Sequence, residues 1–189
     1  MVDTQWSKFE VFQQNQEGQP HHNAGSVHAP DAEMALLNAR DVFVRRPSCV
    51  SLWVVPADAL YTITEEELQR STDVVNPFDD AKSTNKIYYI FQKQSQRPSM
   101  NFVSHVGQVE ARNAHEAFLK ARDLSRDQRT YVWWICPEDA IVRSTDEDIG
   151  SMFQPALDKD YRMPQSYHVL RELMEVKTDQ IGLSEIDKS

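Results

Sequence analysis

Hydrophobic and polar positions recur along this chain in four blocks that appear twice, offset by roughly 80 positions. The first block, residues 9–13 (FEVFQ) and 88–92 (YYIFQ), is rich in the aromatic and β-branched residues that suit a pleated surface. The second block, residues 25–29 (GSVHA) and 107–111 (GQVEA), comes directly before a helix-start signal in each copy. These patterns predict two strands at the start of each half, joined by a polar loop.

The third block predicts a helix in each half. Asp31 and Asn113 occupy matching N-cap positions, and Glu116 stands three residues after Asn113, as a capping-box partner would. Pro47 is expected to close the first helix. Apolar residues then follow the i, i+3, i+4, i+7 spacing of a stripe that packs on a sheet. The stripe consists of Ala32, Ala35, Leu36, Ala39 and Val42 in the first half and of Ala114, Ala117, Phe118, Ala121 and Leu124 in the second.

The fourth block, residues 52–59 and 133–140, predicts a third strand that ends at Pro56 and Pro137. Each half is therefore expected to be a ββαβ module with a helix packed on an antiparallel sheet, so the fold class is α+β. Two such modules in tandem imply pseudo-twofold symmetry, because a module that pairs with a copy of itself can be fused to that copy. We interpret residues 62–86, with an acidic run and a turn-rich stretch, as a surface connection. This places the first module at 1–75, the second with a C-terminal arm at 76–176, and a flexible polar tail at 177–189.

Composition narrows the range of partners. The 189 residues carry a formal net charge of -9, which disfavours nucleic acid and anionic membranes. The chain contains no apolar run of the roughly 20 residues needed to cross a bilayer, and its start lacks the features of a signal peptide, so we expect a cytoplasmic protein. Cys49 and Cys136 form no CxxC pair, which favours buried or free thiols over a disulfide or a metal site.

The motifs of common active sites are absent from the sequence. None of the six histidines has a glutamate three residues before it, so the Glu-x-x-His pairs of a di-iron helical bundle are missing. His21, His22 and His28 cluster in the sequence without a cysteine or carboxylate beside them, and we interpret them as solvated loop and strand residues rather than metal ligands. Because neither a glycine-rich phosphate loop nor a nucleophile elbow occurs, we expect no catalytic residue, no metal and no cofactor in this chain.

Without active-site motifs, the residues of interest are those that could bind a partner protein. Arginines near the predicted helix ends can be ordinary solvated side chains, or they can engage acidic patches on a partner. Residues 152–167 combine aromatics, prolines and an arginine, and we interpret this segment as an extended docking strap rather than core. The candidate partner-binding residues are Arg40, Arg45, Arg46, Arg122, Phe153, Tyr161, Arg162 and Tyr167.

The same blocks resemble the B-subunit family of phenylacetate degradation, PaaB. The resemblance at the start of the chain rests on residues 9–12 (FEVF), 25–29 (GSVHA), 34–36 (MAL), 38–41 (NARD), 45–46 (RR) and 53–55 (WVV). At the other end it rests on residues 153–156 (FQPA), 159–162 (KDYR), Pro164 and Tyr167. Members of that family are single modules, whereas here a second copy lies between the family-like start and the family-like end.

The resemblance implies a non-catalytic bridging subunit of a multicomponent phenylacetyl-CoA epoxidase. Its implied partners are a di-iron catalytic A subunit and a C subunit, with the reductase E subunit and a second copy of the chain as further candidates. The complex would epoxidise the aromatic ring with O₂ and NADPH. The alternative is a stand-alone dimeric α+β protein, either an enzyme or a ligand binder, with a small-ligand pocket near His28 or Glu110.

Overall fold

The computed structural model describes residues 6–44, 49–70, 84–95, 103–125 and 129–157. Residues 1–156 form one compact unit. Residues 157–189 form a second unit, of which the described residues include only Leu157. The architecture below is that of the first unit.

Each half repeats one order of elements. The first half contains β1 (Lys8–Gln14), β2 (His22–His28), α1 (Ala32–Phe43), β3 (Ser51–Pro56), η1 (Ala57–Ala59), β4 (Tyr61–Thr64) and α2 (Glu65–Arg70). The second half contains β5 (Lys86–Lys93), β6 (Ser104–Ala111), α3 (Ala114–Leu124), β7 (Val132–Pro137), η2 (Glu138–Ala140), β8 (Val142–Arg143), η3 (Asp146–Asp148), η4 (Ile149–Phe153) and α4 (Gln154–Leu157). The predicted strand, strand, helix, strand order is confirmed in both halves.

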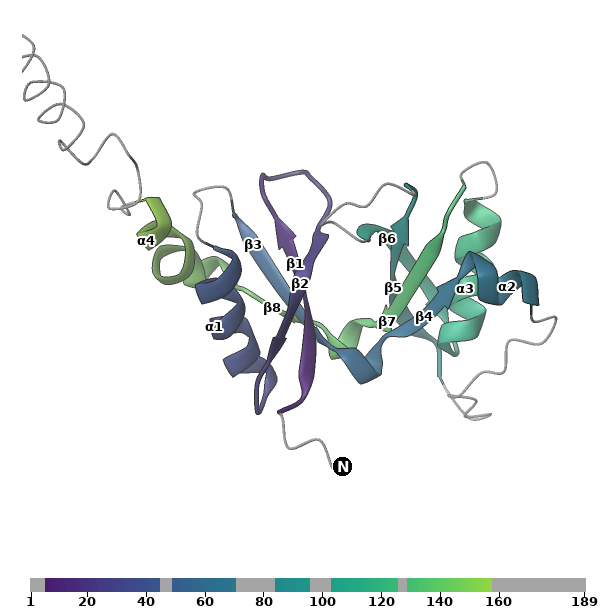
Figure 1. Cartoon of the computed structure of the whole chain (residues 1–189), viewed down its shortest axis with the longest axis horizontal. Helices are drawn as coiled ribbons and strands as arrows, with labels where there is room; N and C mark the ends of the chain where they lie inside the picture. The colour runs from purple at the N-terminus through teal and green to yellow at the C-terminus, as the bar shows by residue number, and fades with distance from the viewer. Residues whose placement is uncertain (1–5, 45–48, 71–83, 96–102, 126–128, 158–189) are drawn as a thin grey trace, which may run out of the picture. The chain divides into compact units, whose positions relative to one another are not determined.

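Within the described residues, eight strands form one sheet in the order β4-β7-β5-β6-β2-β1-β3-β8 (Figure 1). The paired neighbours run antiparallel, which confirms the α+β class. The halves meet where β2 and β6 pair through His22 and Ser104. Backbone hydrogen bonds flank this pair, from Asn23 N to Val103 O at 2.8 Å and from His105 N to His21 O at 2.7 Å. The sheet therefore continues from one half into the other.

The two halves also exchange their last strands. β4 of the first half pairs with β7 of the second, with Tyr61 opposite Ile135, and β8 pairs in return with β3, with Val142 opposite Val54. The interpretation of residues 62–86 as a surface connection is wrong at its start, because Thr62–Thr64 belong to β4. The alternation of buried Tyr61 and Ile63 with more exposed Thr62 and Thr64 is the period of two typical of a strand. The module boundary near residue 75 stays a prediction.

The helix starts follow the predicted caps. Asp31 Oδ1 accepts a hydrogen bond from Met34 N, and Asn113 Oδ1 accepts one from Glu116 N, both at 2.8 Å. The Glu116 carboxylate binds Arg112 N, one residue before the position that a capping box would use. The helices end at Phe43 and Leu124, and Pro47 lies outside the described residues.

The apolar stripe of each helix packs on the sheet, except at its last position. The buried residues of α1 are Ala35, Leu36 and Ala39, and those of α3 include Ala117, Phe118 and Ala121. Val42 is 47% exposed and Leu124 is 80% exposed, so the prediction is wrong for these two residues. At about 100° per residue, the i+10 position has drifted off the centre of the stripe and faces solvent.

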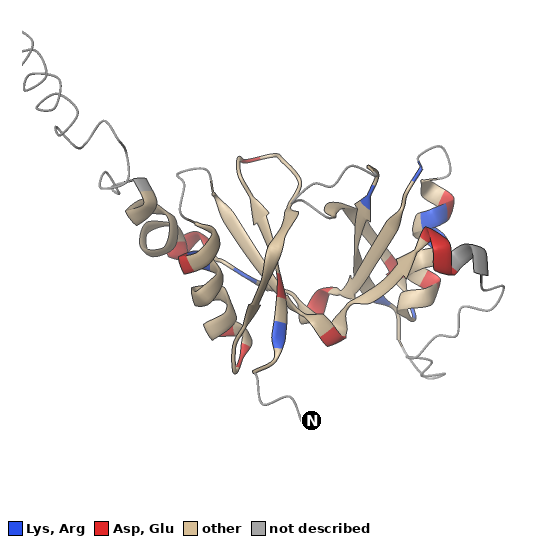
Figure 2. Ribbon diagram, viewed as in Figure 1, with Lys and Arg blue, Asp and Glu red and all other residues tan. Residues whose placement is uncertain are grey.

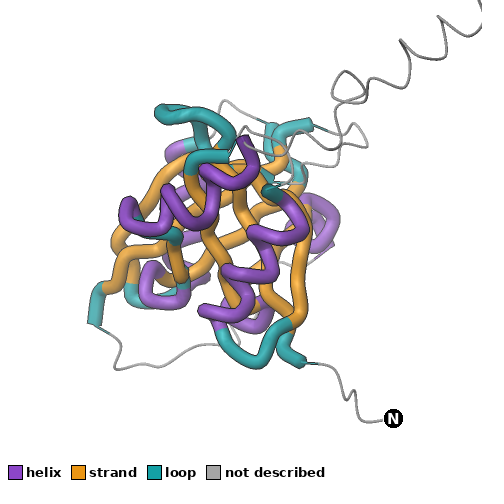
Figure 3. The backbone as a smooth tube through the Cα atoms, turned by 90° about the vertical axis from the view of Figure 1, so that its left-hand side faces the viewer, coloured by secondary structure: helices purple, strands orange, loops and turns teal. Residues whose placement is uncertain are grey.

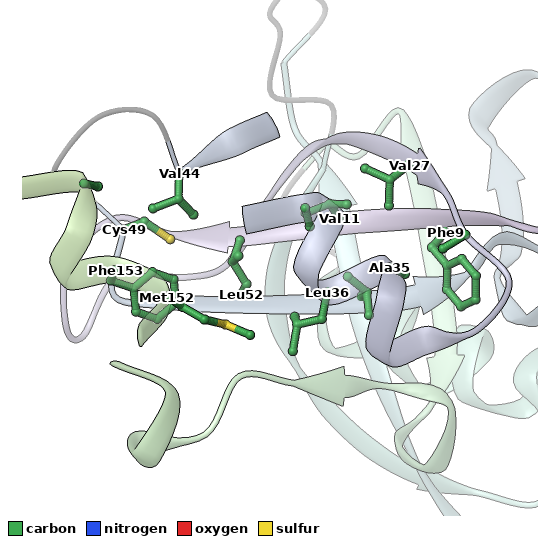
Figure 4. Close-up of a cluster of buried hydrophobic side chains, with 14 residues drawn as sticks. Phe9, Val11, Val27, Ala35, Leu36, Val44, Cys49, Leu52, Met152 and Phe153 are labelled. Atoms are coloured by element: carbon green, nitrogen blue, oxygen red, sulfur yellow. The ribbon is translucent and has the colours of Figure 1, made fainter. Parts of the chain in front are cut away.

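Among the residues that the structure describes, three groups of buried side chains form the core. One lies between α1 and its strands and includes Phe9, Val11 and Leu52 (Figure 4), and a second lies between α3 and its strands. Figure 3, viewed from the side of α1, shows helices covering the near side of the strands. The third group contains residues from both halves, among them Phe12 and Phe91. Each half thus uses one face of its sheet for its helix and shares the other face with its counterpart.

Candidate functional site

The contact between the halves centres on two phenylalanines at equivalent positions. Phe12 of β1 and Phe91 of β5 stack with their ring centroids 4.2 Å apart, and both are fully buried. Each is opposite a tryptophan, Trp53 for Phe12 and Trp134 for Phe91. The matching registers confirm that the two halves are structural repeats. They also allow the surroundings of the two tryptophans to be compared position by position.

Around Trp53 the site is polar and aromatic. The His21 ring stacks on the Trp53 ring with a centroid distance of 3.5 Å, while the rings of Tyr89 and His105 lie 5.6 Å and 5.4 Å away. The Arg143 guanidinium lies 5.4 Å from the Trp53 ring centroid and 5.1 Å from that of Tyr89. This cation–π contact ties β8 to aromatic side chains of both halves. We call these five residues the Trp53 cluster.

Glu138 completes the electrostatics of this cluster. Its carboxylate is 3.2 Å from a nitrogen of Arg143, and Oε1 accepts a hydrogen bond from the Tyr89 hydroxyl at 3.3 Å. Burial raises the pKa of Tyr89, so this phenol stays protonated and can donate. The charge of Arg143 is thus balanced by one carboxylate as well as by two aromatic faces.

The two histidines of the cluster are neutral. Burial lowers the pKa of His21 to about 3, with a smaller contribution from nearby His105, and burial also lowers the pKa of His105. The His21 Nε2 atom lies 3.0 Å from the Ser51 hydroxyl. Among the described residues, His105 Nε2 and Arg143 Nε are buried without a hydrogen-bond partner. The interpretation of His21 as a solvated loop residue is therefore wrong, because its ring is buried against Trp53.

Around Trp134 the equivalent positions carry different chemistry. The register places Glu10 where the other half has Tyr89, Asn23 where it has His105, and Thr62 where it has Arg143. Asn23 Nδ2 donates to Glu10 Oε2 at 3.1 Å, and Lys8 pairs with the other oxygen of the same carboxylate at 2.7 Å. The two halves have diverged at the interface that they share, so the pseudo-twofold symmetry of the fold does not extend to its polar groups.

The arrangement is suited to joining the halves more than to activating a nucleophile. Burial raises the pKa of Cys49 to about 11 and that of Cys136 to about 12, so both thiols stay protonated. Both are free cysteines, as predicted. Over the part of the chain that the structure describes, no group of three or more His, Cys, Asp or Glu side chains could hold a metal ion.

The structure places three of the eight candidate partner-binding residues. Arg40 is paired with Asp41 at 2.7 Å, and Arg122 is exposed with its guanidinium 5.7 Å from the Phe118 ring centroid. Phe153 is buried with Met152 in the core beneath α1 (Figure 4). Arg45, Arg46, Tyr161, Arg162 and Tyr167 lie outside the described residues.

The burial of Phe153 corrects the docking-strap interpretation at its start. Residues 149–157 are helical, and Met152, Phe153 and Ala156 are all buried. Their i, i+1, i+4 spacing is that of a helical stripe, which the aromatic and proline content of the segment had obscured. Phe153 is core in this chain and offers no free surface. The partner-binding role of the other candidates stays a prediction.

Sequence reasoning missed most of the Trp53 cluster. The sequence around Arg143 and Tyr89 does not indicate that they belong to a cluster, because their contact partners are distant in sequence. Comparing the two halves at equivalent positions would have identified them as sites of divergence. His28 and Glu110, named for the alternative small-ligand pocket, are both exposed, and that alternative stays a prediction.

Comparison with known proteins agrees with the repeat. The profile of the family described as phenylacetic acid degradation B, PaaB, matches residues 5–89 and again residues 84–174. The B subunit of the 1,2-phenylacetyl-CoA epoxidase of Escherichia coli K12 is 42% identical over 67 residues, which are 35% of this chain and 70% of that protein. No solved structure matches the chain. Among the helices of the described residues, none is long and apolar enough to cross a membrane.

These findings define a tandem protein built from two copies of one small α+β module that share a sheet and a core. The chain belongs to the PaaB family, and both of its halves match that family.

Proposed function

We propose that this chain is the non-catalytic bridging subunit of a phenylacetyl-CoA epoxidase and acts in phenylacetate degradation. The observation that carries the proposal is the double match to the PaaB family, together with 42% identity to the B subunit of such an epoxidase. In this role the chain binds the di-iron catalytic A subunit and the C subunit, and the oxygen chemistry takes place in the partner. The reductase E subunit is a further candidate partner, and the cytoplasm is the expected compartment.

The fold supports a bridge because it carries two related outer surfaces on one body. α1 and α3 lie on different parts of the sheet, each covering the strands of its own half (Figure 1). The exchanged strands β4 and β8 join the halves, so the two helices are held by a shared sheet and not by a linker alone. A body of this kind can hold two partner subunits at a defined separation.

The test is reconstitution from the same organism. The A and C subunits would be co-expressed with and without this chain, and the assemblies separated by size exclusion with mass determination. NADPH-dependent turnover of phenylacetyl-CoA would be measured after addition of the E subunit. We expect the chain to co-elute with A and C, and turnover to depend on it. If A and C assemble and turn over fully while this chain elutes alone, the proposed function is wrong.

A further inference from the structure

The outer faces of α1 and α3 are built on the same plan. In α1 the Asn38 side chain donates to the backbone oxygen of His28 at 3.2 Å. In α3 the Lys120 side chain donates to the equivalent oxygen, that of Glu110, at 2.7 Å. Both faces also carry an exposed leucine, Leu37 in α1 and Leu119 in α3. The two faces can therefore be compared residue by residue.

The face of α1 is apolar and uncharged at its centre. Met34 is 42% exposed, Leu37 39% and Val42 47%, and these residues share the outward side of the helix with Asn38. We call Met34, Leu37, Asn38 and Val42 the α1 patch. Exposed apolar side chains grouped in this way mark interaction surfaces more often than isolated ones do.

The equivalent face of α3 is charged. Glu116 replaces Met34, and its carboxylate pairs with Arg112 at 3.0 Å and with Lys120 at 2.9 Å. Hydrogen bonds from Lys120 and Arg112 lower the pKa of Glu116 to about 2, so its carboxylate is ionised at neutral pH. Figure 2 shows the contrast, with α3 carrying both blue and red segments and α1 largely tan between its ends. Although Leu119 and Leu124 are also exposed on α3, covering its ion pairs would require their desolvation.

The rim of the α1 patch indicates the chemistry of its partner. Asp31 and Glu33 are exposed at the start of the helix, and the Asp41 side chain is 68% exposed near its end. Arg40 is the basic residue of the last turn and pairs with Asp41. An apolar centre with an acidic rim is complementary to an apolar patch edged by Lys and Arg.

From this asymmetry we infer that the α1 patch is the surface on which one of the other epoxidase subunits docks, through an apolar patch edged by basic side chains. The inference rests on the proposed function and adds that the halves are not interchangeable. α1 carries the tight contact. The charged face of α3 contributes a weaker contact, so the bridge is asymmetric.

The decisive experiment exchanges the two faces. Met34→Glu with Asn38→Lys converts the α1 patch to the pattern of α3, and Glu116→Met with Lys120→Asn makes the reverse change. The probe is the assembly of the A and C subunits, immobilised and titrated with the full chain. We expect M34E/N38K to weaken binding by about tenfold or more, as loss of the centre of an interface does. E116M/K120N should stay within about twofold of the unmodified chain. Thermal melting of each variant checks the fold.

A second variant guards against misfolding. Leu37→Gln adds no charge and changes one exposed helix position, so stability should shift by no more than about 0.5 kcal/mol. It should still weaken binding several-fold. The acidic rim adds a salt dependence, with affinity falling as KCl is raised from about 0.05 M to about 0.5 M.

The outcomes separate the two proposals. If the unmodified chain does not bind the A and C assembly, the proposed function fails and this inference fails with it. If the unmodified chain binds and both α1 variants bind as tightly, only the inference is overturned. Loss of binding in E116M/K120N, or an affinity that does not change with salt, would also overturn it, since the contact would then be at α3 or lack a basic edge.

Discussion

Phe12 and Phe91 occupy equivalent positions in the two halves and stack on each other with their ring centroids 4.2 Å apart. Both side chains are fully buried within the cluster that the halves share. A residue and its repeat thus contact each other, as happens on the axis of a twofold dimer. Here both residues of the contact belong to one chain.

Replacing either phenylalanine by alanine should destabilise the whole chain. We expect each substitution to lower the free energy of unfolding by about 3–5 kcal/mol, because a buried ring is lost and a cavity remains. The double variant should lose less than the sum by about 0.5–1.5 kcal/mol, the coupling of a ring pair. Urea unfolding followed by tryptophan fluorescence measures both. Leu124→Ala, at a residue 80% exposed, is the control and should change little. Strict additivity of the two phenylalanine substitutions would contradict the contact.

Gly25 and Gly107 are equivalent residues under different constraints. Gly25 has a φ of 137°, and a Cβ added there would lie 3.0 Å from Cζ of Phe43, whereas a Cβ on Gly107 would meet nothing within 4 Å. Gly25→Ala should therefore lower the free energy of unfolding by about 1–3 kcal/mol. Gly107→Ala should stay within about 0.5 kcal/mol of the unmodified chain. Urea titration of both variants checks this, and equal losses would show that the two positions are constrained alike.

The repeated elements were predictable because their signals are local. Helix starts at Asp31 and Asn113 and strands ending at Pro56 and Pro137 depend on residues a few positions apart, and the structure has them where they were expected. The exchange of β4 and β8 was not predictable, because Tyr61–Thr64 and Val142–Arg143 are short strands and nothing local selects the partner of either.

The candidate site was less accessible to sequence reasoning than the fold. Phe153 combined an aromatic ring with a nearby proline and suggested an exposed strap, but tertiary packing buries it. His21 was interpreted as solvated because no cysteine or carboxylate stands beside it in the sequence. Its stacking partner, Trp53, comes from a different strand. Such residues become visible only when the contacts between strands are known.

The two thiols should be inert in the folded chain. Cys49 and Cys136 are both free and buried, and burial raises the pKa of each thiol, to about 11 and about 12. Because the thiolate is the reacting form, we expect no reaction with a disulfide reagent at pH 8 over minutes, and reaction of both thiols once urea unfolds the chain. Cys49→Ser and Cys136→Ser variants identify each thiol. Rapid labelling of either cysteine at low urea would show that its core opens locally.

Lowering the pH should reduce the free energy of unfolding, because His21 is buried in its neutral form. Burial lowers the pKa of this residue from 6.5 to about 3, so the unfolded state binds a proton below pH 6.5 that the folded state does not. Stability from His21 is therefore complete above pH 6.5 and is lost as pH falls towards 3, at about 1.4 kcal/mol per pH unit. From pH 6.5 to pH 5 the loss is about 2 kcal/mol. His105 and His22, whose pKa values burial also lowers, act in the same direction.

His21→Gln isolates this contribution, because glutamine does not titrate. The variant should be less stable than the unmodified chain at pH 8, since the stack on Trp53 is lost. Its further loss between pH 8 and pH 5 should be smaller by about 2 kcal/mol. Urea unfolding at the two pH values measures the difference. The two pH values are kept at 5 or above because of the carboxylates of Glu116 and Asp148. Their pKa values are lowered from ordinary values below 5, so their contribution to the free energy of unfolding is lost only in more acidic solution. A variant that loses as much stability as the unmodified chain would show that the His21 ring is protonated in the folded state.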